Sequence, residues 1–281
     1  MVASEPGIGG DKSRGAGRVR APRSSWRSVV VPAEHGGWGL TFEAVLLGLL
    51  VRPSGAGAAV GGAALLAFVA RTPLKLAGVD HRRHRRLDRT VLAERVAAAE
   101  LSLLSVAVAL AVLYGRGWWW VPLAAAIPFF GLELSFDVRS RGRRLTPELS
   151  GAVGMGAVAA AAIGSAGGLE ARLAVGLWVV LASRAVAAVP FARTQVRRLK
   201  SQPDQRRVAD SAQMATVVVV LAGWAIGLLA WPAVIAVAGL AVWNAAAMRC
   251  RVRSAEQIGV SQMLAGLVVV AAAATGVLVG A

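Results

Sequence analysis

The sequence predicts an all-α fold, a polytopic membrane bundle of about nine transmembrane helices. Its composition is 56% hydrophobic and its mean hydropathy is +0.60, well above the values of a soluble domain. Apolar runs of about twenty residues, the length that crosses a bilayer as a helix, recur along the whole chain. Lys and Arg gather in alternate connections between these runs, which is the pattern of a multi-pass membrane protein.

The first three spans follow from hydropathy and from the charged residues that interrupt it. The first two lie at roughly 36–51 and 55–74, and Arg52 falls in the short connection between them. The third, roughly 92–114, includes Glu94 and Glu100. The first is short and the third carries acidic groups, so these two depart most from the usual span.

The remaining six spans complete the predicted bundle. Ala, Leu, Val and Gly dominate them with almost no period-2 alternation, which predicts helices and not barrel strands. Their approximate limits are 118–136, 147–167, 173–190, 212–229, 231–248 and 258–280.

The distribution of basic residues predicts the orientation of the bundle. Of the 31 Lys and Arg residues, 27 fall before the first span or in and beside every second connection, within 1–35, 71–95, 139–144, 193–207 and 249–253. Arg52, Arg116 and Arg172 fall in the other connections, and Arg184 falls inside a span. This bias places the N-terminus in the cytoplasm and, with nine spans, the C-terminus outside, in the inner (plasma) membrane. It also accounts for the net charge of +16, so the lipid bilayer is the expected partner and nucleic acid is not.

Residues 1–30 are expected to form a disordered, basic cytoplasmic arm, and residues 31–281 the nine-helix transmembrane domain. The arm lacks the short apolar core of a removable signal peptide. The single cysteine, Cys250, has no partner for a disulfide, and four arginines surround the two histidines of "HRRH". We therefore expect no metal and no cofactor.

The stretch "VPAEHGGWGL", residues 31–40, brings ionisable groups to the start of the first span. Glu34 and His35 can serve as a helix cap beside the interfacial Trp38. Glu43 lies two turns into the span on roughly the same face as His35, where a carboxylate requires a partner or a polar cavity. The alternative interpretation makes His35 and Glu43 candidate catalytic groups of a polar site facing the cytoplasm.

Basic residues enter the second and sixth spans. Arg71 and Lys75 stand four residues apart and share a helix face. Arg184 lies deep in an apolar run, and Arg193 and Arg197 follow it. Snorkelling and topology explain such residues, while the functional alternative is a site for a diphosphate or an anionic lipid.

Acidic residues in or beside the spans allow two interpretations as well. They can compensate the charges of the buried basic residues, or serve as a base or proton-relay group in a pocket. The set comprises Glu43, Glu94, Glu100, Glu133, Asp137 and Glu148, of which Glu133 and Asp137 stand four residues apart.

Several stretches resemble the YwiC-like family of bacterial integral membrane proteins. They are "PAEHGGWGLTFEAVLLGLL", "ARTPLKL", "LSFDVRSRGRRLTPELSGAVGMGA" and "PFARTQVRRLK", which together cover most of the chain after residue 30. The chain departs from the usual family motif with Glu34 before His35 and with Gly37 in place of Ala. This resemblance implies a membrane protein and no particular reaction.

The stretch "RSRGRRLTPELSGAVGMG" is also similar to one in UbiA-type prenyltransferases, which have nine helices and two aspartate-rich motifs at the cytoplasmic ends of helices two and six. At the matching places this chain carries Arg71 and Lys75, and Arg184, Arg193 and Arg197. Magnesium diphosphate requires carboxylate oxygens, whereas arginines can bind a diphosphate or a lipid headgroup directly.

Two functions follow. The first is a UbiA-like protein, with or without transferase activity, that binds an isoprenoid diphosphate or an anionic lipid in a basic cavity facing the cytoplasm. That cavity would be lined by His35, Glu43, Arg71, Lys75, Arg184 and Arg193. The alternative is a transporter of a small anion or of protons, which requires polar residues through to the outer face. The substrate, the reaction and the oligomeric state stay open.

Overall fold

A computed structural model describes residue 29 and residues 35–138, 144–167, 170–250, 252 and 254–280. The described residues are almost entirely helical and include no strand. The helices are α2 (His35–Val51), α3 (Gly55–Arg82), α4 (Asp88–Tyr114), α5 (Val121–Val138), α6 (Leu145–Met155), α7 (Ala157–Ser165), α8 (Ala171–Leu199), α9 (Arg206–Ala225), α10 (Trp231–Ala247) and α11 (Ala255–Gly280). Each of the nine expected spans therefore corresponds to one helix or to one pair of helices. Apart from Val29, the predicted basic arm lies outside the described residues.

The helices are apolar enough to make this an integral multi-pass membrane protein. Within the described residues, six helical segments are long and apolar enough to cross a membrane, and two shorter apolar helices, 36–51 and 231–247, accompany them. Large hydrophobic side chains such as Leu113, Val218 and Val279 are exposed on the outside of the bundle. Lipid is the environment in which such a surface is stable.

The expected span 147–167 consists of α6 and α7, which meet at Gly156. A side chain at this position would collide with Trp178 of α8. The indole of Trp178 donates a hydrogen bond of 2.7 Å to the backbone oxygen of Val153. An inserted side chain that takes up a helical carbonyl is a recognised cause of an interrupted helix.

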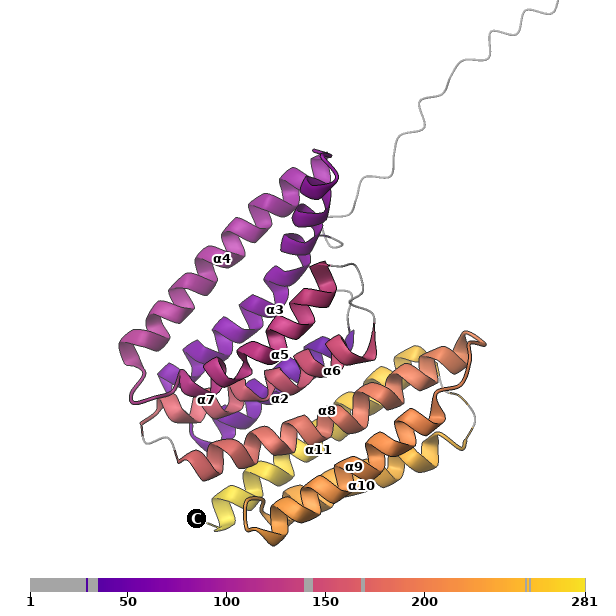
Figure 1. Ribbon diagram of the computed structural model, residues 1–281. Helices are drawn as coiled ribbons and strands as arrows, with labels where there is room; N and C mark the ends of the chain where they lie inside the picture. Colours follow the sequence, from indigo (N-terminus) through magenta and orange to yellow (C-terminus); the bar gives the residue numbers. More distant parts are fainter. Residues whose placement is uncertain are drawn as a thin grey trace, which may run out of the picture.

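The helices form two groups that run at an angle to one another (Figure 1). One group contains α3 and α4, packed along each other, with α5, α6 and α7 beside them, and the other contains α8, α9, α10 and α11. Helix α2 packs against α3, α6 and α7 of the first group and against α11 and α8 of the second. The two groups are therefore joined through α2 and also directly, where α8 packs against α6 and α7.

Helix α7 forms the centre of the packing, and all nine of its residues are buried. They are mainly alanines, which let neighbouring backbones come close, as is usual between membrane helices. At Gly48 of α2 even a single methyl group would collide with Ala162 and Ala159 of α7.

Helices α3 and α4 continue beyond their apolar parts and end in a hairpin tip, residues 81–89, whose side chains are all exposed. Beneath this tip Asp80 is buried and accepts hydrogen bonds from Arg89 at 3.0 and 3.2 Å and from the Thr90 hydroxyl at 2.8 Å. His81 and Glu94 form a further contact of 2.7 Å between the two helices. These bonds fix the hairpin outside the apolar part of the bundle.

Candidate functional site

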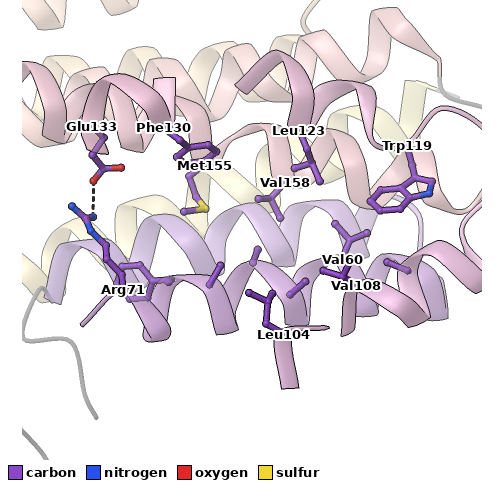
Figure 2. A pocket seen from close by; sticks show the side chains of 15 residues that line it. Val60, Arg71, Leu104, Val108, Trp119, Leu123, Phe130, Glu133, Met155 and Val158 are labelled. Carbon is purple, nitrogen blue, oxygen red and sulfur yellow. Dashed lines mark ion pairs between the residues drawn. The ribbon is translucent and has the colours of Figure 1, made fainter. Parts of the chain in front are cut away.

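A cavity of about 410 Å³ lies between α3 and α4 on one side and α5, α6 and α7 on the other (Figure 2). This volume is within the range of small-molecule sites, about 300–1,000 Å³. Its lining is almost wholly apolar, and the residues are Val60, Ala63, Ala64, Ala67, Phe68, Arg71, Leu104, Val108, Ala111, Trp119, Leu123, Phe130, Glu133, Met155 and Val158.

The two charged lining residues lie at one end of the cavity and form an ion pair, while Trp119 lies at the other end (Figure 2). The guanidinium of Arg71 is 2.5 Å from a carboxylate oxygen of Glu133 and 2.6 Å from one of Asp137. The ammonium of Lys75 is 3.0 Å from the other oxygen of Asp137. Two basic residues on α3 thus face two acidic residues on α5, each pair with i,i+4 spacing.

Helix α6 leaves room for one of these carboxylates. Gly151 lies against Glu133, and any side chain at that position would overlap its oxygens. The preceding residue of the helix, Ser150, donates a hydrogen bond of 2.8 Å to the backbone oxygen of Phe129 on α5. The charged end of the cavity therefore depends on close contact between α5 and α6.

Glu43 and Arg184 form a second ion pair, buried where α2, α8 and α11 meet. The two nitrogens Nε and Nη2 of Arg184 are each 2.8 Å from one oxygen of Glu43. Arg184 Nη2 also donates to the backbone oxygen of Gln262 at 2.7 Å. Gly266 lies against both charged groups, and a side chain there would overlap them. This two-pronged arrangement compensates both charges away from water.

Amide side chains extend this polar region across the second group of helices. Gln262 donates to Asn244 at 2.9 Å, and Asn244 and Gln213 both donate to the backbone oxygen of Ala187, at 3.1 and 2.8 Å. Pro190, three residues after Ala187, interrupts the regular hydrogen bonding of α8. The sequence interpretation missed these amides. Their one signal was the presence of polar residues within the expected spans.

The other predicted site residues lie nearer the helix ends. Arg193 of α8 is 3.0 Å from Glu148 of α6. Arg197 donates to the backbone oxygen of Pro203 at 3.2 Å, within the connection from α8 to α9. The side chain of His35 lies outside the described part of the chain.

The structure thus distributes the candidate residues over separate clusters. Arg71 lines the cavity and Lys75 pairs beside it, whereas Glu43, Arg184 and Arg193 pair elsewhere. The cause is the packing: α3 packs mainly along α4 and also against α2 and α7, while α8 packs against α9, α10, α11, α6 and α7 and, less extensively, against α2. Each basic residue therefore meets acidic residues of its own neighbours.

The fold and these sites define a multi-pass helical membrane protein with an apolar internal cavity and buried ion pairs. The model of the family described as YwiC-like protein matches residues 31–163, so this part of the chain is similar to that family. The match extends from the start of α2 into α7, so it includes every residue that lines the cavity. Comparisons with curated proteins and with solved structures gave no match.

Proposed function

We propose that the protein binds one hydrocarbon chain of a membrane amphiphile in the cavity between α3, α4, α5 and α7. The proposed ligand is an isoprenoid diphosphate or an anionic phospholipid, whose head group lies at Arg71 and Lys75. The observation that carries this proposal is an apolar cavity of about 410 Å³ whose charged end includes a guanidinium.

The apolar lining supports the proposal that a hydrocarbon chain occupies the cavity. Thirteen of the fifteen lining residues are apolar, and most of them come from helical segments long and apolar enough to cross a membrane. A hydrocarbon chain that passes from the bilayer into such a lining exchanges one apolar environment for another and has no hydration to lose. A polar molecule would lose its hydration there without gaining hydrogen bonds.

The charged end of the cavity supports the proposed position of the anionic head group. Guanidinium and ammonium groups bind phosphate oxygens, and Arg71 offers a planar pair of donors. The side chain of Lys75 is half exposed, so a head group can reach it from outside the cavity. Glu133 and Asp137 balance the two positive charges in the ligand-free state, and a phosphate would share these cations with them.

The orientation is part of the same proposal. With the N-terminus in the cytoplasm of a cell bounded by its plasma membrane, the Arg71 end of the cavity faces the inner leaflet. Anionic head groups are enriched in that leaflet.

Native mass spectrometry of the purified protein tests the proposal, because it identifies the lipids that stay bound. The wild type is expected to retain an isoprenoid diphosphate or an anionic phospholipid, and the two differ in mass. Ala63→Phe fills the cavity and should lose both, whereas Arg71→Ala should lose selectivity for anionic head groups.

Two matched variants serve as controls. Ala58→Phe introduces the same bulk on the exposed side of α3, and Arg52→Ala removes an arginine that pairs with Glu170 away from the cavity lining. Both should retain the wild-type lipids. Equal retention by the wild type and Ala63→Phe would show that the bound lipid is not in the cavity.

A further inference from the structure

Both ends of the cavity are closed by side chains. Figure 2 shows the indole of Trp119 at one end and the ion pair of Arg71 and Glu133 at the other. The connection that carries Trp119 folds closely onto the end of α4, because a side chain at Gly115 would collide with the indole. A chain that entered along the axis of the cavity would have to displace one of these closures.

The side walls differ in how firmly they are covered. Helix α3 packs against α2 and α7, and α5 packs against α6 and α7, so these walls belong to the body of the bundle. Helix α4 packs along α3, at the edge of the bundle. Only 17% of its most apolar stretch is buried, compared with 61% in α8.

Helix α4 nevertheless supplies part of the cavity lining. Leu104, Val108 and Ala111 lie on its inner face, with spacings of four and three residues. The opposing residues Leu123 and Phe130 belong to α5. On this side the cavity is thus bounded by α4 and α5, which are joined in sequence through the tryptophan-rich connection. We call the line along which Leu104 and Val108 of α4 meet Leu123 and Phe130 of α5 in the cavity wall the seam.

We infer that the ligand enters sideways from the bilayer through the seam between α4 and α5, as one chain of a lipid whose head group stays at the membrane surface. This inference rests on the proposed function and specifies the class of substrate. The substrate is a membrane-dissolved amphiphile, and a water-soluble molecule of the same volume is excluded. The ion pair of Arg71 and Glu133 stays formed while the chain enters.

Time-resolved photocrosslinking tests the route. The probe is a phosphatidylglycerol with a diazirine in one acyl chain, added in vesicles to protein in nanodiscs, and mass spectrometry locates the adducts at successive times. Entry through the seam predicts that Leu104 and Val108 are labelled first, and that Met155 and Val158 on the far wall follow. First adducts at Trp119 or at Phe68 beside Arg71 would overturn the inference in favour of an end route.

Two variants that open the ends provide an independent measurement. Trp119→Ala removes one closure and Glu133→Ala breaks the ion pair of the other. Neither should speed the labelling of Met155, and faster labelling in either variant would again overturn entry through the seam. Absence of adducts at every lining residue of the wild type, both with this probe and with an isoprenyl diphosphate that carries a diazirine, would instead reject the proposed function itself, so the two failures are distinguishable. Ala63→Phe, which fills the cavity, serves as the blank.

Discussion

Among single residues, the buried pair of Glu43 and Arg184 is expected to have the largest effect on stability. Glu43→Ala leaves a guanidinium in an apolar core without its counter-charge, which costs about 3–5 kcal/mol of unfolding free energy. The exposed pair of Arg52 and Glu170 provides the control, and Glu170→Ala should cost at most about 1 kcal/mol. Equilibrium unfolding in detergent measures both, and similar losses in the two variants would contradict the structural assignment.

Two glycines of α11 give a matched pair for a second prediction. Gly266→Ala places a methyl group against Glu43 and Arg184 and should destabilise the protein by about 1–3 kcal/mol, the usual cost of overpacking. Gly259→Ala meets nothing within 4 Å and should stabilise α11 by about 0.5–1 kcal/mol. Thermal unfolding of the two variants compares them directly. Shifts of the same sign would show that Gly266 does not touch the ion pair.

The residue-scale predictions from the sequence succeeded where the signal was a charge in an apolar run. Glu43 and Arg184 each required a partner, and the structure supplies one to the other. The pairing itself could not be predicted, since the two residues are 141 positions apart and the neighbours of each helix were unknown. Asn244 and Gln213 escaped notice because they carry no charge, and the sequence interpretation followed the charged residues in the spans.

Among the elements, α3 and α4 extend beyond their predicted limits at the hairpin that joins them. The predicted span 55–74 ends just after Pro73, but α3 continues through this proline to Arg82. A proline removes one backbone hydrogen bond, and packing along α4 supports the helix on both sides of it. Hydropathy located the apolar part of each helix and could not locate the polar turns that extend it.

The continuation of these helices predicts a role for Asp80. Asp80→Ala removes the acceptor shared by Arg89 and Thr90 and should loosen the hairpin tip, at a local cost of about 1–3 kcal/mol. Hydrogen exchange of the amides in residues 81–92 should then be faster, while exchange in α8 stays unchanged. The exposed Asp88 is the control, and equal effects of Asp88→Ala and Asp80→Ala would show that the buried hydrogen bonds do not hold the tip.

For the whole molecule, the prediction that remains to be tested is its orientation. Cys250 is exposed at the end of α10, on the side expected to face the cytoplasm, so a membrane-impermeant maleimide should not label it in intact cells. In a Cys250→Ser background, Arg116→Cys lies in the opposite connection and should be labelled. Labelling of permeabilised cells, in which the reagent reaches both sides of the membrane, controls for the reactivity of each cysteine. The reverse pattern would invert the proposed topology.

At this scale the sequence predicted the class of fold well and the site only in part. Hydropathy and charge located all nine helical segments, because a bilayer selects for length and polarity directly. The cavity depends on which helices are in contact and on the side-chain volumes of residues such as Ala63, Ala67 and Met155. It therefore could not be predicted from any local sequence pattern. The expected single basic cavity combined residues that share a membrane face but belong to different packing groups.

The hairpin tip also has a practical consequence for imaging. A membrane protein of this size, 28.9 kDa, offers few features outside the bilayer by which particles can be aligned. Helices α3 and α4 project together beyond the apolar part of the bundle, held by the hydrogen bonds of Asp80. His84 lies in the turn between them with a left-handed φ of 50°. A rigid fiducial domain spliced into that turn, with both helices continued into it, would move as one body with the cavity walls.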